Sequence, residues 1–300
     1  MNNSVVSFEN VSKRFGKQYA VDGVSFEVQE GRIFGLLGPN GAGKTTSIRM
    51  LTNILVPDEG VVRLGGEVVS PETQRHIGYL PEERGLYKKM KVKEQLIYFS
   101  RLKGLSRSDS AKSISYWLDR FGAKEWAEKE VSELSKGMQQ KIQFIATIAH
   151  DPMCLIFDEP FSGLDPINSE LLKDIILELR STGKTIFFAT HRMEQVEQLC
   201  DDIALFNHGK LVLSGEVSKV KAAFGKNTLK IRFKGSPDFL NQLEHVRIAS
   251  KSQHSAEIVL KDGADDQKIL RHALDSVHVH SFELIEPSVQ EIFIDTISKS

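Results

Sequence analysis

The stretch GPNGAGKT, Gly38 to Thr45, matches the pattern G-x-x-x-x-G-K-[ST] at every fixed position. The apolar run RIFGLLG precedes it, and the helix-forming run KTTSIRMLTNIL, residues 44–55, follows it. A glycine-rich turn between a strand and a helix lets backbone N–H groups surround a phosphate at the positive end of the helix dipole. The stretch therefore predicts a phosphate-binding loop in which Lys44 reaches the β- and γ-phosphates and Thr45 offers its hydroxyl to Mg²⁺.

The run LIFDEP, residues 155–160, supplies acidic groups that would complement such a loop. Asp158 ends an apolar strand, where a carboxylate is costly unless it serves an ion. It can hold Mg²⁺ directly or through water, and the alternative is a helix N-cap. Glu159 can polarise a water for attack on the γ-phosphate. His191 ends the strand TIFFATH, which we predict to neighbour the Asp158 strand, so His191 either contacts the γ-phosphate or is an ordinary residue at a strand end.

A second stretch, SELSKGMQQKIQF, residues 132–144, also has the character of an anion site. Ser135 and Gly137 stand just ahead of apolar residues at helical spacing. Small polar residues at a helix start leave backbone N–H groups and the positive end of the helix dipole available to an anion. Since the chain already holds a complete phosphate loop, this second site raises the question of which phosphate it serves.

Short apolar strands alternate with helices over residues 1–219, which predicts an α/β domain with a parallel sheet. Strands and turns are expected over residues 5–36 and a hairpin over 59–69. Buried strands are expected at 153–160 and 184–191. Residues 92–150 read as helices throughout, and we interpret them as an inserted helical subdomain.

A change of pattern near residue 220 predicts a second domain over residues 220–300. Residues 218–227, SKVKAAFGKN, are expected to form a polar bridge. Strand and helix patterns then alternate in the order βαββαβ, with the first helix at 237–245 and an additional helix at 287–298. This order is typical of a ferredoxin-like α+β domain.

Composition sets limits on partners and compartment. The chain of 300 residues has 39 basic and 40 acidic side chains and a net charge of −1, so no overall field favours nucleic acid or an anionic membrane. Cys154 and Cys200 lie in apolar contexts and are expected to be buried free thiols, as in a reducing compartment. We see no signal peptide and no apolar run of the roughly 20 residues that a membrane span needs. His278 and His280 are not expected to bind metal, because no further ligands accompany them.

Five stretches together resemble the nucleotide-binding subunits of ABC transporters. GPNGAGKTT resembles their Walker A loop, LIFDEP their Walker B strand, SGLDP their D-loop, THRMEQVEQLCD their His-switch region, and LSKGM stands at the place of their LSGGQ signature. The stretch GYLPEERGLY and the small C-terminal domain are similar to the subgroup that serves ABC-2-type exporters, such as sodium-extrusion and multidrug ATPase subunits. The resemblance implies a P-loop NTPase fold with a RecA-like parallel-sheet core, an antiparallel β subdomain and a helical subdomain.

The resemblance also implies roles for individual residues. Two subunits would bind head to tail, each ATP lying between the loop of one subunit and the Ser135 and Gly137 of the other. Phe15 would stack on adenine, with Tyr19 as the alternative, and Asp165 would lie at the subunit interface. The loop contacts to ATP would come from Gly38, Pro39, Asn40, Gly41, Ala42, Gly43, Lys44, Thr45 and Thr46. Metal contacts would come from Thr45, Asp158 and Glu82.

Two positions depart from the family pattern. Lys136 stands where the signature has glycine, and it either adds positive charge near the nucleotide or points to solvent. Glu82 stands where the Q-loop glutamine is expected. A carboxylate can still meet Mg²⁺ or water, but it adds negative charge beside Glu159 and ATP.

The function implied is ATP hydrolysis, with ATP and Mg²⁺ as cofactors and Glu159, His191 and Lys44 as catalytic residues, powering export through separate integral membrane permease subunits. The subunit would lie at the cytoplasmic face of the membrane, as a homodimer or heterodimer, with no nucleic acid partner. The alternative is a soluble ABC-type ATPase that acts as a regulatory or interaction module. Residues 220–300 would be a ligand sensor, or a dimerisation or docking appendage.

Overall fold

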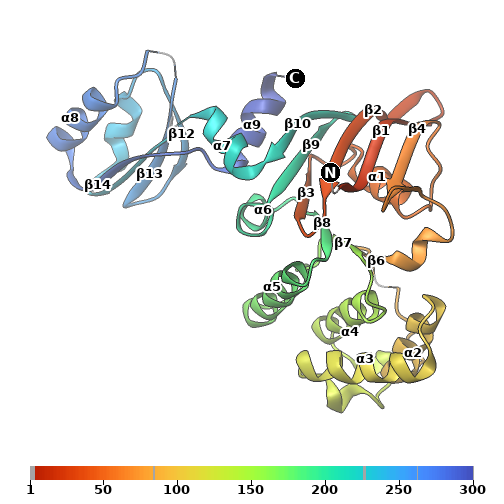
Figure 1. Cartoon of the computed structure of the whole chain (residues 1–300). Helices are drawn as coiled ribbons and strands as arrows, with labels where there is room; N and C mark the ends of the chain where they lie inside the picture. The colour runs from red at the N-terminus through yellow and green to blue at the C-terminus, as the bar shows by residue number, and fades with distance from the viewer. Residues whose placement is uncertain (1–3, 84, 226–227, 262, 300) are drawn as a thin grey trace. The chain divides into compact units, whose positions relative to one another are not determined.

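The computed structural model describes residues 4–83, 85–225, 228–261 and 263–299. Contacts within the chain divide it into two compact units, Met1–Ser214 and Gly215–Ser300 (Figure 1). Arg84, within the stretch GYLPEERGLY, and the last two residues of the expected polar bridge, 226–227, lie outside the described residues.

A six-stranded sheet in the order β10-β9-β3-β8-β7-β6 forms the centre of the first unit, as far as the structure describes it. The register makes β3 parallel to β8 and β9, and β7 parallel to β6 and β8. Because these strands run the same way, their carboxyl ends share one edge of the sheet. The bounds are β3 Ile33–Leu37, β6 Ile77–Leu80, β7 Cys154–Asp158, β8 Thr185–Ala189, β9 Asp202–Asn207 and β10 Lys210–Glu216.

An antiparallel sheet in the order β2-β1-β4-β5 accompanies the parallel one. Its strands are β1 Ser4–Phe15, β2 Gln18–Gln29, β4 Glu59–Leu64 and β5 Glu67–Val68. Buried and exposed residues alternate along much of β2, as expected for a sheet with one face on the core. The parallel core and the antiparallel β subdomain predicted from the sequence are therefore confirmed.

Helices connect and cover these strands. They are α1 Lys44–Leu51, α2 Val92–Leu102, α3 Arg107–Arg120, α4 Lys136–Ile148, α5 Pro166–Ser181 and α6 Met193–Leu199, with short 3₁₀ segments at Thr73–His76, Lys124–Trp126 and Val131–Glu133. Helices α2, α3 and α4 pack on one another as the expected helical subdomain (Figure 1). The helix expected over 44–55 ends earlier, at Leu51, because Asn53 takes a left-handed φ of 54°.

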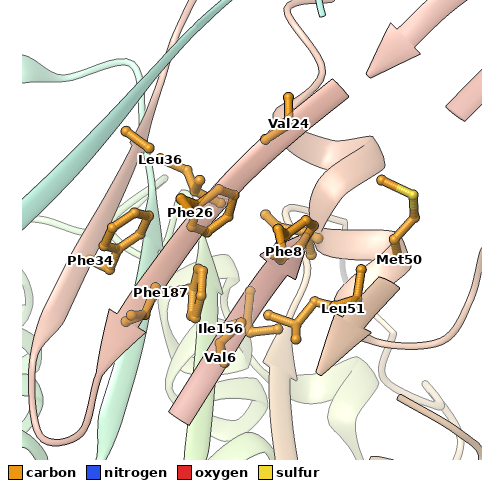
Figure 2. Packing of buried hydrophobic residues seen from close by; sticks show 14 of the residues in the cluster. Val6, Phe8, Val24, Phe26, Phe34, Leu36, Met50, Leu51, Ile156 and Phe187 are labelled. Carbon is orange, nitrogen blue, oxygen red and sulfur yellow. The ribbon is translucent and has the colours of Figure 1, made fainter. Parts of the chain in front are cut away.

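One apolar cluster joins both sheets of the first unit. Figure 2 shows Phe8 of β1, Phe26 of β2 and Phe34 of β3 side by side. The rings of Phe8 and Phe26 stack with centroids 4.5 Å apart, and those of Phe26 and Phe34 at 5.3 Å. Met50 and Leu51 of α1 belong to the same cluster. The helix that follows the glycine loop is thus anchored on the core by its apolar side chains.

The second unit is an antiparallel sheet in the order β12-β13-β11-β14, which is the strand order of a ferredoxin-like fold. Its strands are β11 Thr228–Lys234, β12 Val246–Lys251, β13 Ser255–Leu260 and β14 His278–Ile285, and its helices are α7 Val217–Phe224, α8 Asp266–Ser276 and α9 Val289–Lys299. The unit has an apolar core of its own, which includes Leu229, Ile231 and Ile258. The helix expected over 237–245 is a 3₁₀ helix, Pro237–Gln242, and it buries only Phe239 and Leu240.

The expectation of a polar bridge over 218–227 was wrong. Most of this segment belongs to α7, which buries Val217 and Val220 and packs against α9. The lysines of this segment made it look polar, although Val217 and Val220 stand at helical spacing. The boundary predicted after residue 219 falls inside α7, whereas the contacts of the chain divide it after Ser214.

Cys154 and Cys200 are free and buried, as expected, and burial raises the pKa of the Cys154 thiol to about 12. Within the described part of the chain, we find no helix with the length and apolar character that a bilayer crossing requires.

Candidate nucleotide-binding site

The glycine loop follows β3 directly and is held close to its neighbours. Gly38 has φ 144°, and a Cβ there would lie 2.4 Å from the carbonyl oxygen of Phe206. Gly43 has φ 111°, and a Cβ there would lie 2.4 Å from the carbonyl oxygen of Ala20. Both positions therefore require glycine for conformation and for space.

The end of the loop presents backbone donors. Gly43 stands at the N-cap of α1 and cannot cap with a side chain, so the first N–H groups of the helix remain available to an anion. The Nζ of Lys44 donates to the carbonyl oxygens of Gly38 at 2.7 Å and Pro39 at 3.0 Å. Burial lowers the pKa of Lys44, and the charges of Asp158 and Glu159 oppose that shift.

A cavity of about 300 Å³ lies beside the loop. Its walls include Phe15, Gln18, Tyr19 and Ala20 from the β1–β2 hairpin and residues 40–46 from the loop and α1. Phe15 and Tyr19 expose 54% and 40% of their surface, although both are aromatic. The guanidinium of Arg14 lies over the Tyr19 ring, 5.2 Å from its centroid. Both aromatic residues named in the sequence analysis thus line the same cavity, and Gln18 and Ala20, which sequence reasoning missed, line it with them.

Asp158 is the last residue of β7, two strands from β3. Its pKa is raised to about 6, first by burial and then by the negative charges of Glu82 and Glu159, while Lys44 and Arg49 oppose the shift. Asp158 ends β7, Glu159 follows it and Glu82 follows the neighbouring strand β6, so the three carboxyl groups share the carboxyl edge of the sheet. The helix N-cap considered for Asp158 does not occur, since α5 is capped by Asp165 instead.

Glu159 and His191 form a direct pair. Glu159 takes a left-handed φ of 50°, which is strained for a residue with a side chain and is common at functional sites. Its Oε1 lies 2.7 Å from Nδ1 of His191 and accepts the His191 backbone N–H at 2.8 Å. The carboxylate is largely buried, whereas the imidazole exposes 71% of its surface.

Thr190 is a contact of Glu159 that sequence reasoning missed. Its hydroxyl, which is buried, lies 3.2 Å from Oε2 of Glu159 and 3.3 Å from Oε1 of Gln195, and it accepts the backbone N–H of Arg192. The only signal in the sequence is a hydroxyl residue directly before His191 at the end of a buried strand.

Glu82 follows the end of β6, next to β7. Gln143 of α4 fixes this segment: its Nε2 donates to the carbonyl oxygens of Pro81 at 3.3 Å and Glu83 at 3.1 Å. Gln143 is 5% exposed, and its Oε1 has no hydrogen-bond partner among the described residues. The helix of the signature stretch therefore holds the two carbonyls on either side of Glu82.

The other predicted site residues do not line the loop cavity. Ser135 is the N-cap of α4, where its hydroxyl accepts the N–H of Met138 at 3.3 Å. Gly137 lies in the first turn, where a Cβ would come no nearer than 3.9 Å to Leu164. Lys136 is exposed. Asp165 caps α5 and accepts the Asn168 N–H at 2.9 Å, and the hydrogen bonds from Asn168 lower its pKa.

Comparison with known proteins identifies the family. Residues 21–162 match the family model described as ABC transporter, and residues 215–297 match the model described as the C-terminal domain of DrrA1-3-like ATP-binding proteins. The ABC transporter ATP-binding protein YhaQ of Bacillus subtilis is 42% identical to this chain over 293 residues, 98% of each chain. The Nod factor export ATP-binding protein I of Paraburkholderia xenovorans is 37% identical over 227 residues, 74% of each chain.

A solved structure of the ATP binding subunit of an ABC transporter superposes with a TM-score of 0.70 at 28% identity, covering 74% of this chain and 94% of the other. The fold, the order of the motifs and these relatives agree. The chain therefore belongs to the ABC transporter ATP-binding proteins, and it is the ATP-hydrolysing subunit of such a transporter.

Proposed function

We propose that this ATPase binds ATP and Mg²⁺ at the loop, hydrolyses ATP in a head-to-tail dimer, and powers export through separate membrane subunits. One observation carries the proposal. The glycine loop, Glu82 and His191 follow β3, β6 and β8, and Asp158 is the last residue of β7, so all four lie at the carboxyl ends of neighbouring parallel strands of one sheet. Ligand sites of open α/β sheets lie at this edge.

ATP would lie along the loop. The backbone N–H groups near Gly43 and the ammonium of Lys44 would bind its phosphates, and the carbonyl contacts of Lys44 would give way to phosphate oxygens. The adenine would enter the cavity lined by Phe15 and Tyr19, because exposed aromatic rings at a cavity offer faces for stacking. Phe15 is the more exposed of the two, which favours it as the stacking residue.

The acidic groups at the sheet edge fit Mg²⁺. The raised pKa of Asp158 shows that burial and neighbouring negative charge disfavour its ionised form without a cation. Carboxylate and hydroxyl oxygens are the hard ligands that Mg²⁺ prefers. Asp158 and Thr45 would therefore hold the ion, and Glu82, which follows the neighbouring strand β6, would act through water. Bound Mg²⁺ would neutralise phosphate charge.

Glu159 would act as the general base. In hydrolysis the water oxygen bonds to the γ-phosphorus, the bond from phosphorus to the bridging oxygen of ADP breaks, and a water proton passes to Glu159. Here the oxygens of Glu159 face donors from His191 and Thr190. If the exposed ring of His191 turned toward a γ-phosphate, Oε1 of Glu159 would keep only the His191 backbone N–H and could accept a hydrogen bond from the water.

The signature stretch would serve a different nucleotide. Ser135 and Gly137 form the N-terminus of α4, but neither lines the cavity of its own loop. This separation supports an arrangement in which each signature caps the ATP held by the partner subunit, with Asp165 at the interface. The exposed position of Lys136 fits the interpretation that it points to solvent in the single chain.

A complementation experiment tests the dimer. Lys44→Ala disables the loop, and Ser135→Arg disables the signature. In a head-to-tail dimer of one subunit of each kind, one site combines an intact Lys44 with an intact Ser135. Mixing the two inactive variants should therefore restore about a quarter of the wild-type ATPase rate, because half of the dimers are mixed and half of their sites are intact.

The control is a mixture of Lys44→Ala with a Lys44→Ala, Ser135→Arg double variant, which contains no intact loop and should stay inactive. If the first mixture shows no more activity than its components, then loop and signature do not meet between subunits and the dimer proposal is wrong.

The export role is supported by a relative. The protein of Paraburkholderia xenovorans is described as an export ATP-binding protein and shares 37% identity over most of this chain. In this role the chain would act through permease subunits at the cytoplasmic face of the membrane. Purification of the tagged chain from gently solubilised membranes should recover an integral membrane protein, whereas recovery with ribosomes or DNA would contradict the proposal.

A further inference from the structure

We propose that the second unit binds a small zwitterion of the α-amino acid class with an apolar side chain. The site is a cavity of about 520 Å³ formed entirely by residues of this unit. The end of α7, one end of β12, the end of β13 and the first turns of α9 contribute its walls. A volume of this size is typical of small-molecule sites. The proposal does not depend on the proposed function of the first unit.

Glu291 supplies the first argument. It lines the cavity, exposes 7% of its surface and stands in the first turn of α9. Its Oε2 accepts the backbone N–H of Ser288 at 2.8 Å and the Ser288 hydroxyl at 3.1 Å, while the Ser288 hydroxyl accepts the Glu291 N–H at 3.2 Å. This reciprocal pair is a capping box.

The capping box explains only one of the two carboxylate oxygens. Oε1 of Glu291 is buried and has no hydrogen-bond partner among the described residues. A buried polar atom without a partner costs free energy, and a carboxylate oxygen more than most. A ligand that donates an N–H to Oε1 would remove this cost, and an ammonium group is the strongest donor of that kind.

The opposite charge lines the same cavity. Arg247 of β12 and Lys261, just after β13, both belong to its walls. Arg247 pairs in register with Val259, so Arg247 and Lys261 project from the same face of the sheet. Neither side chain forms an ion pair or hydrogen bond with another residue that the structure describes. Two cations of this kind suit a carboxylate, and a guanidinium binds it through two parallel hydrogen bonds.

The remaining walls are apolar and include Phe224, Val259 and Ile292. A simple anion would satisfy Arg247 and Lys261 but would leave Oε1 of Glu291 unpaired in a cavity that Asp295 also lines. A simple cation would leave the two basic groups without a partner. A ligand with an ammonium, a carboxylate and an apolar side chain satisfies all three parts of the cavity.

The test uses isothermal titration calorimetry on the full chain with L-phenylalanine and L-leucine. N-acetyl-L-phenylalanine lacks the cationic group, and L-phenylalaninamide lacks the anionic group. At least one of the two free amino acids should bind. L-phenylalanine should bind at least about tenfold more tightly than each of its two blocked forms, because each of them lacks one charged group. No binding of either amino acid up to about 10 mM, or equal binding of the blocked forms, would overturn the proposal.

Two variants test which side chain binds the ammonium group of the ligand and which binds its carboxylate. Glu291→Gln keeps the capping box, since glutamine also serves at this position, but removes the charge. It should weaken L-phenylalanine binding about tenfold and change N-acetyl-L-phenylalanine binding much less. Arg247→Gln should weaken the binding of L-phenylalanine and of N-acetyl-L-phenylalanine and leave the binding of L-phenylalaninamide unchanged. Lys251→Gln, an exposed change on the same strand, is the matched control and should alter none of them. Unchanged L-phenylalanine binding by Glu291→Gln would contradict the assignment of Oε1.

Discussion

Asp158 is a carboxyl group whose surroundings favour its neutral form. Burial and the charges of Glu82 and Glu159 raise its pKa from 3.8 to about 6. The folded chain therefore keeps a proton on Asp158 between about pH 4 and pH 6, where the unfolded chain has lost it. Below this pH range, Asp158 does not lower the unfolding free energy of the metal-free first unit. Above the range, ionisation of the buried Asp158 lowers that free energy by its full amount. The fold thus holds Asp158 where it can bind a cation, and this placement lowers the stability of the metal-free first unit.

Asp158→Asn should consequently stabilise the metal-free chain at neutral pH. With an allowance for partial solvent screening, the gain in unfolding free energy should be about 1–2 kcal/mol at pH 7 and close to zero at pH 4. Urea unfolding of the first unit at the two pH values measures the difference. Asp174→Asn, on the exposed side of α5, is the control and should show no such pH dependence. An equal effect of Asp158→Asn at both pH values would exclude the charge as its cause.

Thr190 acts on Glu159 through its hydroxyl, which lies 3.2 Å from Oε2. Thr190→Val keeps the shape of the side chain and removes that group. The ATP turnover number should fall about tenfold, because a mispositioned base loses part of its contribution, while the dissociation constant for ATP stays the same. Thr190→Ser restores a hydroxyl and should recover most of the turnover. A loss of ATP affinity, or no recovery with serine, would indicate a packing role instead.

At the scale of elements, α4 links the signature stretch to the segment after β6. Gln143 makes this link through two hydrogen bonds, to the carbonyl oxygens of Pro81 and Glu83. Gln143→Leu removes both bonds and should increase hydrogen exchange after β6 by about tenfold or more. Gln139→Leu is the matched control, since Gln139 bonds instead to Val131 and Leu134. Equal protection of residues near Glu82 in both variants would show that α4 does not hold this segment.

The sequence reveals elements better than contacts between them. The parallel sheet, the glycine loop and the βαββαβ order were predictable, because hydrophobic period and glycine position are local signals. Helix α7 was missed because lysines surround its apolar pair. The contacts of Gln143 join residues about 60 positions apart, and no local pattern encodes such a pairing. Glu159 was recognised by its motif, but its left-handed backbone depends on the packing of β7 and β8.

At the scale of the whole molecule, each unit has its own apolar core. The cluster that includes Phe8 and Phe26 lies in the first unit, and the cluster that includes Ile231 and Ile258 lies in the second. The two clusters share no residue among those described. Because cooperative unfolding follows a continuous core, the two units are expected to unfold in separate transitions.

A ligand of one unit should then raise the unfolding midpoint of that unit alone. With Glu159→Gln to prevent hydrolysis, Mg²⁺ and ATP at about one hundred times the dissociation constant should stabilise the first unit by about 2.7 kcal/mol and raise its midpoint by about 5–10 °C. The other midpoint should stay within about 1 °C, because none of the residues lining the loop cavity belongs to the second unit. Differential scanning calorimetry of the full chain measures both midpoints at once. A single transition that shifts as a whole would show that the two cores unfold as one cooperative unit.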